Sequence, residues 1–174
     1  LNDSPAYGPA DGEWTGQPLV DGTYKTLIEV RRTISGVNRN GDATFDFVVA
    51  NNPLSPPALT PRQLVTLAAC NQCHNDIQLH GGARRAVEGC KICHTIGSED
   101  SLTVTPGLTV NFPDMIHQIH RGADLPQVKA TANSADPYQY AINGTIDFSE
   151  VGFPILPDGI GRCDACHGDA AQGA

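Results

Sequence analysis

The six cysteines of this 174-residue chain form three C-x-x-C pairs, and a histidine directly follows each pair. The three motifs are Cys70-Asn71-Gln72-Cys73-His74, Cys90-Lys91-Ile92-Cys93-His94 and Cys163-Asp164-Ala165-Cys166-His167. C-x-x-C-H is the attachment signature of c-type haem. Two thiols on one helical turn can reach the two vinyl groups of a haem edge, and the histidine then meets the iron from the proximal face. The sequence therefore predicts three covalently bound haem c groups.

Other uses of paired cysteines match the pattern less well. The first four cysteines also have the spacing of a zinc site, but zinc would leave the third pair without mates and three histidines unexplained. Disulfides within the pairs would each close a small strained ring. A thioredoxin-like site needs a βαβ context, which the sequence around the motifs lacks. Haem attachment accounts for every cysteine.

The histidine count equals the number of axial ligands that three bis-histidine haems need. The expected iron ligands are His74, His94 and His167 on the proximal side and His80, His117 and His120 on the distal side. The competing axial ligand is the single methionine, Met115, whose place beside His117 favours a packing role.

The spacing leaves the pairing of ligands open. His80 lies too close to His74 to reach the same iron, so we expect it to serve another haem, with His117 and His120 serving the other two. A distal ligand from a neighbouring subunit is the alternative.

We expect two parts, an arm and β-rich segment over residues 1–57 and a haem domain over residues 58–174. Residues 1–20, rich in Gly, Pro and Asp, read as an extended arm. Alternating apolar residues on both sides of Asn40-Gly41, a hairpin turn signal, predict a β-hairpin or part of a small β-sandwich.

Within the haem domain, two short helices have clear boundary signals. Thr60, with Pro61 and Gln63 behind it, predicts a helix start, and the first haem motif is expected to end that helix. Residues 113–121 predict a second helix, closed by Gly122, on which His117 and His120 share a face. Residues 125–145 are predicted to have irregular structure.

The composition indicates what fills the interior. Aromatic residues make up only 6% of the chain, whereas Gly (18) and Pro (13) are frequent, so an ordinary aromatic core is thin and coil is abundant. We therefore expect the fold class of a multihaem cytochrome c: a few short helices and much coil organised around stacked haems, with the small β-element at the N-terminus. The haem-free chain is expected to be largely unfolded.

The net charge of −8 argues against nucleic acid or an anionic membrane as the main partner. No apolar run approaches the roughly 18 residues of a membrane span. The chain starts at Leu1 without a signal sequence, so it reads as a mature or trimmed form. Because haem c is attached on the exported side of the inner membrane, we expect an extracytoplasmic protein.

The motifs and their surroundings resemble the outer-surface decahaem cytochromes of metal-reducing bacteria. The resemblance covers about residues 60–168 in order. It rests on Cys70-Asn71-x-x-His74-x-x-Ile77-x-x-His80-Gly81-x-x-Arg84, Cys90-x-x-Cys93-His94, Met115-Ile116-His117-x-x-His120-x-Gly122, Asp147-Phe148-Ser149, Phe153-Pro154 and Cys163-x-x-Cys166-His167. It implies haem attachment and bis-histidine ligation at these positions, electron transfer to minerals, shuttles or other cytochromes, and a place outside the cell, with the periplasm as the alternative. The family has ten haems where this chain has three motifs, so the chain looks like one module, a reduced relative or a repeating filament subunit.

With both axial positions of each iron filled, no iron could bind substrate. We therefore expect an electron carrier and not an enzyme. The partners would be other multihaem cytochromes or extracellular acceptors, with a homopolymer (a nanowire) as a further alternative. The alternative is a reductase of a small oxyanion, or a haem sensor, with one open iron site. Candidate partners for the haem propionates are Arg62, Arg84, Arg85, Lys91, Arg121, Lys129 and Arg162.

Overall fold

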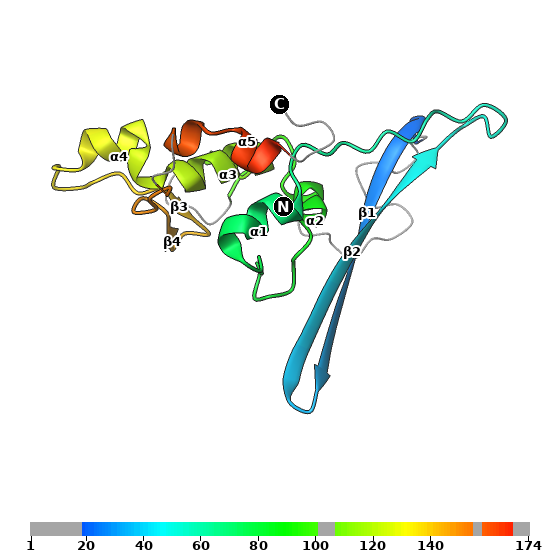
Figure 1. Ribbon diagram of the computed structural model, residues 1–174, viewed down its shortest axis with the longest axis horizontal. Coiled ribbons are helices and arrows are strands. Elements are labelled where there is room, and N and C mark those ends of the chain that lie inside the picture. The colour runs from blue at the N-terminus through cyan, green and yellow to red at the C-terminus, as the bar shows by residue number, and fades with distance from the viewer. Residues whose placement is uncertain (1–18, 101–106, 155–157, 169–174) are drawn as a thin grey trace. The chain divides into compact units, whose positions relative to one another are not determined.

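The computed structural model describes residues 19–100, 107–154 and 158–168 (Figure 1). The chain divides into two compact units, and the division falls between Ile92 and Cys93. The N-terminal unit contains β1 (Gly22–Ile34), β2 (Val37–Val49), α1 (Leu67–His74) and most of α2 (Val87–Cys93). The C-terminal unit contains α3 (Phe112–Arg121), η1 (Gly122–Asp124), α4 (Pro126–Thr131), β3 (Ala141–Ile142), β4 (Ile146–Asp147), η2 (Gly159–Gly161) and α5 (Asp164–His167). The expected arm over residues 1–20 lies almost wholly outside the described residues.

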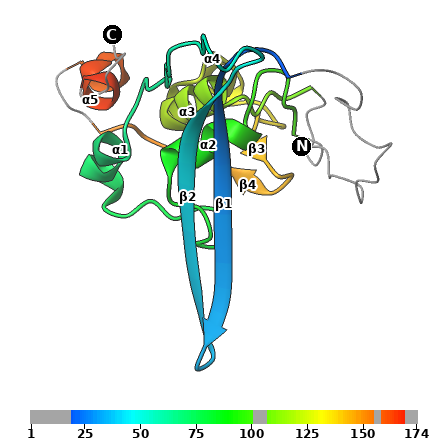
Figure 2. The ribbon, with the colours of Figure 1, turned by 90° about the vertical axis from the view of Figure 1, so that its right-hand side faces the viewer.

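The expected β-hairpin is present, but its turn is not where the sequence signal put it. β1 and β2 pair antiparallel from Gly22↔Val49 to Ile34↔Val37 and run side by side over their full length (Figures 1 and 2). The turn is Ser35-Gly36, with φ of 50° and 77°, as a two-residue primed turn requires. The prediction of a turn at Asn40-Gly41 was wrong. That turn would have paired residues 24–28 with residues 53–57, where three prolines cannot donate to a ladder.

The two faces of the hairpin differ in chemistry. One face carries apolar side chains that remain exposed: Ile28 is 61% and Phe45 is 65% exposed. The other face is polar and includes Lys25, Glu29 and Asp42. Within the N-terminal unit this polar face contacts α2, where the position of a Cβ on Gly89 would lie 3.0 Å from Leu27 Cδ1. A side chain at position 89 would therefore require the end of the Leu27 side chain to move by a few tenths of an ångström.

Helix α1 starts later than the Thr60 signal predicted. Thr66 is its N-cap, and its Oγ1 accepts a hydrogen bond from the Ala69 N–H at 3.1 Å. Thr60 instead donates its N–H to Thr23 Oγ1 on β1, at 2.8 Å. Thr60 thus bonds to a residue 37 positions away in sequence and does not start the helix, although the local pattern predicted that it would. The expectation that the first haem motif ends α1 is confirmed, because the helix stops at His74.

The helix predicted over residues 113–121 is confirmed as α3. It ends at Gly122, whose φ of +33° lies outside the range that L side chains ordinarily adopt. The prediction that residues 125–145 are irregular was wrong in part, because the chain continues through η1 into the helix α4 (Figure 1). Pro126 occupies the first turn of α4, where its missing N–H costs nothing.

The protein interior of the described chain is small. Its one cluster of buried residues in the C-terminal unit consists of Leu108, Leu125 and the fully buried Tyr140. A few short helices with a small β-element therefore match the expected fold class. The β1–β2 hairpin forms a two-stranded sheet of its own, and β3 and β4 form a second, shorter one in the C-terminal unit. None of the described helices is long and apolar enough to cross a membrane.

Candidate functional site

The first C-x-x-C-H motif occupies the last turn and a half of α1. Cys70, Cys73 and His74 follow the Thr66 cap, and the helix is closed by Asn75, whose N–H donates to Asn71 O at 3.1 Å. The Asn71 side chain then accepts the Ile77 N–H at 3.0 Å. Asn71 therefore joins the end of the haem-attachment helix to the loop that follows it, a role that spacing alone did not reveal.

His80 lies in a closed loop just after this motif. Leu79 and Arg84 exchange both backbone hydrogen bonds, at 2.9 and 3.2 Å. Within the loop His80, Gly81 and Gly82 all have left-handed φ values, of 52°, 72° and 81°. For a histidine this conformation costs about 1–2 kcal/mol, so the surrounding contacts must hold it.

The second motif lies on α2, and its histidine directly follows the helix. Burial, with a smaller contribution from the negative charge of Asp42, raises the pKa of the Cys90 thiol. His94 Nδ1 donates to Val110 O at 2.8 Å, since a carbonyl can only accept. This bond places the proton on Nδ1 and the lone pair on Nε2, the orientation that a carbonyl imposes on a metal-ligating histidine.

The third motif lies at α5, and here the structure brings two predicted ligands together. The ring centroids of His117, on α3, and His167, at the end of α5, are 6.2 Å apart. Imidazole nitrogens bind transition metals at about 2 Å and the ring centre lies about 1 Å further away, so two rings on opposite sides of one metal have centres about 6 Å apart. With this spacing, His117 and His167 would be able to hold one haem iron between them.

His120 lies on the same helix as His117 but has other neighbours. Its Nδ1 donates to Ile116 O at 2.8 Å, and its ring meets Phe153 edge-on at 5.9 Å. The hydrogen bond again places the lone pair on Nε2. Met115, the competing axial ligand, is buried in α3. The assignment of all six histidines to particular haems stays a prediction.

The cysteines fit thioether attachment to haem. All six have exposed or intermediate accessibility, and in each motif the two cysteines lie in or next to a short helix and directly precede the histidine. No group of three or more His, Cys, Asp and Glu side chains in the described part of the chain could hold a metal ion by itself. A haem needs only two imidazoles from the protein.

Several of the cations expected to face propionates are engaged in ion pairs. Arg84 pairs with Glu29 at 3.0 Å, and Lys91 pairs with Glu88 at 2.7 Å. Arg85, Lys129 and Arg162 have carboxylate partners too, and these three pairs are more exposed. The Lys129 ammonium holds the pKa of Asp124 below its usual value, and the Nε–H of Arg121 donates to Asp124 O. The Arg62 carbonyl accepts from Lys91 Nζ. A propionate role for any of them stays a prediction.

Comparison with known proteins identifies the family. Residues 62–174 match the model described as outer membrane cytochrome MtrC/MtrF-like, domains II/IV. The chain belongs to this family. A curated relative, "Multiheme cytochrome MtrC" of Shewanella baltica (strain OS185), is 30% identical over 105 residues, which is 56% of this chain and 15% of the relative. No solved structure matches the chain.

Membership of the MtrC/MtrF-like family confirms the resemblance found in the sequence. It implies covalently bound haem c, and the motifs of this chain supply thiols and imidazoles suited to it. The matched region contains every predicted haem motif and distal histidine, whereas the hairpin lies before it. The chain spans only about 15% of the length of this MtrC.

Proposed function

We propose that the chain is a triheme c-type cytochrome module that transfers electrons at the outer cell surface. The observation that carries the proposal is the His117–His167 pair, whose spacing matches two axial ligands of one iron. Membership of an outer membrane cytochrome family supports the location and the general chemistry. The haem domain (residues 58–174) would then carry the electrons, and the arm and β-rich segment (residues 1–57) would support it.

The residues take these roles in the proposal. In each motif the two cysteines hold one haem and the following histidine is the proximal ligand, while His80, His117 and His120 are the distal ligands. When bound, a haem with two axial imidazoles supplies one-electron chemistry at an iron that has no open position. The chain would hold the haems close together, because little polypeptide separates them; stacking of the haems is part of this proposal.

The expected partners are other multihaem cytochromes or extracellular electron acceptors. An electron carrier of this kind is not an enzyme. A homopolymer of this chain also stays a prediction.

The test is the haem content and ligation of the purified holoprotein. Intact mass should show three haem additions and no free thiol, and carbon monoxide should not bind to the reduced protein, because every iron has two axial ligands. His117→Ala should open one iron in three to carbon monoxide, whereas the neighbouring Gln118→Ala should open none. Ready binding of carbon monoxide to the unaltered protein would instead favour an open site and the reductase alternative.

A further inference from the structure

Two carboxylates stand opposite each other on the polar face of the hairpin. Glu29 on β1 and Asp42 on β2 are partners in the strand register. Both reach the segment that lies between His80 and the second haem motif, more than 40 residues away in sequence. No local pattern in the chain links the hairpin to that segment.

Glu29 binds the end of the His80 loop. Its Oε2 accepts hydrogen bonds from both Nε and Nη2 of Arg84, at 3.1 and 3.0 Å. About four-fifths of the Arg84 side chain and three-quarters of the Glu29 side chain are buried, so solvent screens this pair less than the exposed pairs. The Arg84 guanidinium holds the pKa of Glu29 below its usual value, so the carboxylate is ionised at neutral pH.

Asp42 binds the start of α2. Its Oδ2 accepts the backbone N–H groups of Arg85 and Ala86, at 3.1 and 2.9 Å. These are the two residues before α2 begins at Val87, and helix starts leave such donors without partners inside the helix. Asp42 therefore caps the haem-attachment helix from a different element, and its charge suits the positive end of the helix dipole.

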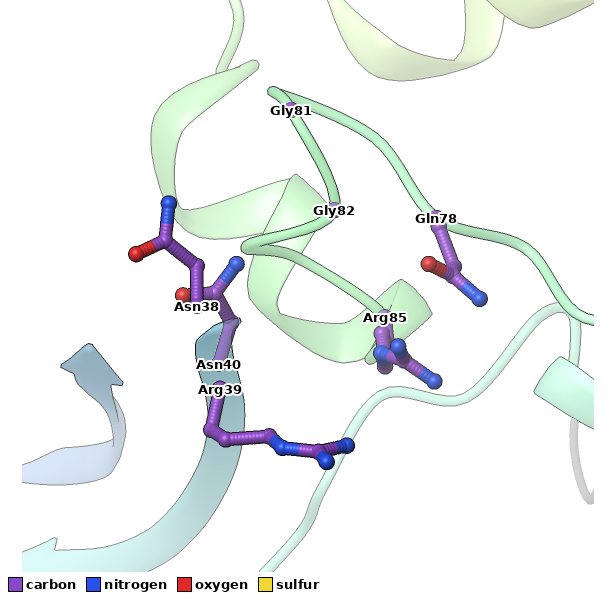
Figure 3. Close-up of a pocket in the computed structure, with 7 residues that line it drawn as sticks. All are labelled: Asn38, Arg39, Asn40, Gln78, Gly81, Gly82 and Arg85. Carbon is purple, nitrogen blue, oxygen red and sulfur yellow. The ribbon is translucent and has the colours of Figure 1, made fainter. Parts of the chain in front are cut away.

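The side of the His80 loop that faces the hairpin is lined by polar groups. A pocket of about 400 Å³ lies beside it, lined by Asn38, Arg39, Asn40, Gln78, Gly81, Gly82 and Arg85 (Figure 3). All of these are polar residues or glycines, so the loop is not packed against apolar side chains there.

We propose that Glu29 and Asp42 form a clamp on the hairpin that positions His80 as an axial ligand and α2 for haem attachment. The inference rests on the proposed function, because it requires His80 to bind an iron. Glu29 acts through Arg84, the closing residue of the His80 loop, and Asp42 acts through the helix start. Both are positioning residues, and neither is proposed to touch haem.

The clamp is tested in the holoprotein with Glu29→Gln, which keeps the shape and removes the charge. We expect intact mass to show full haem attachment, one of the three low-spin EPR signals to shift or broaden, and carbon monoxide binding to rise from none toward one haem in three. Asp46→Asn is the matched control, because Asp46 pairs with Lys25 on the same face at 2.6 Å but does not contact residues 79–86. It should leave all three signals unchanged.

If the Glu29→Gln protein does not accumulate, the double variant E29R/R84E tests the clamp, because it exchanges the two charges and keeps the ion pair. Restored wild-type signals in the swap support the clamp, and altered signals overturn it. His80→Ala separates the two claims. If His80→Ala alters no haem, the ligand role of His80 fails; if it alters one haem while Glu29→Gln alters none, only the clamp fails. Equal changes in Glu29→Gln and Asp46→Asn would also overturn the clamp.

Discussion

At the scale of single residues, the C-terminal unit requires a glycine at position 122. A Cβ at this position would lie 2.3 Å from Val151 O and 2.7 Å from Phe148 O. The N–H of the next residue, Ala123, donates to the same Val151 carbonyl at 2.9 Å. The close approach that ends α3 is therefore possible only without a side chain.

We expect Gly122→Ala to lower the free energy of unfolding by about 3 kcal/mol, because overpacking and the unusual φ both oppose it. Denaturant unfolding of the holoprotein measures this. Gly152→Ala is the control, since nothing lies within 4 Å of its Cβ position, and it should change stability by a few tenths of that amount. An equal loss in both variants would contradict the steric account.

Tyr140 gives the molecule a specific sensitivity to alkaline pH. Its hydroxyl is buried without a hydrogen-bond partner among the described residues, and burial raises its pKa to about 12. The unfolded chain ionises this tyrosine near its ordinary value of 10, whereas the folded chain does not. The contribution of Tyr140 to the free energy of unfolding is therefore fully present below pH 10. It falls by up to about 3 kcal/mol as the pH rises to 12.

Tyr140→Phe should remove that part of the pH dependence and leave stability at pH 7 equal or about 1 kcal/mol higher, because it removes a buried polar group without a partner. Unfolding midpoints between pH 8 and 12 measure both effects. A destabilised Tyr140→Phe protein at pH 7 would show that the hydroxyl has a partner, such as a haem propionate.

At the scale of elements, α1 and the hairpin each have a boundary that differs from the local signal. In α1 the cap is Thr66 and not Thr60. Thr66→Ala should lower the free energy of unfolding by about 1 kcal/mol. Thr60→Ala, which removes only an exposed hydroxyl contact to Thr23 at 3.2 Å, should cost clearly less; the reverse order in denaturant unfolding would restore the original reading.

In the hairpin, the turn glycine is Gly36, with φ of +77°, and Gly41 belongs to strand β2. Nothing lies within 4 Å of the Cβ position of either residue, so backbone conformation alone separates them. We expect Gly36→Val to destabilise the hairpin by about 1–2 kcal/mol and Gly41→Val to be tolerated or slightly stabilising. Hydrogen exchange of the hairpin amides would distinguish the two.

At the scale of the whole molecule, the described chain buries few of its own apolar side chains. Nine hydrophobic residues among those described are buried, and three of them are alanines. Covalently attached haem would supply the missing apolar interior, which links cofactor attachment to folding. The low aromatic content of the sequence and the small core of the structure agree on this point.

Loss of the third haem should therefore loosen the C-terminal unit. We expect C163A/C166A to show two haem additions by mass and a lower unfolding midpoint than the unaltered protein. Asp164→Ala, within the same motif but without a thiol, should retain three haems and serves as the control. Full stability of the two-haem protein would contradict the view that haem forms the core.

The haem motifs, the number of histidines and the bounds of α3 were predictable from the sequence by itself, because they depend on residues within a turn or two of each other. Attachment needs two thiols and an imidazole at fixed local spacing, and Gly122 marks a helix end wherever the helix packs.

Only the tertiary structure decided the hairpin register, the start of α1, the His117–His167 pair and the contacts of Glu29 and Asp42 with the His80 segment. Each of these depends on groups tens of residues apart, and many pairings satisfy the local patterns equally well. Sterics and the pairing of charges and hydrogen bonds select among them, and those act only once the chain has folded.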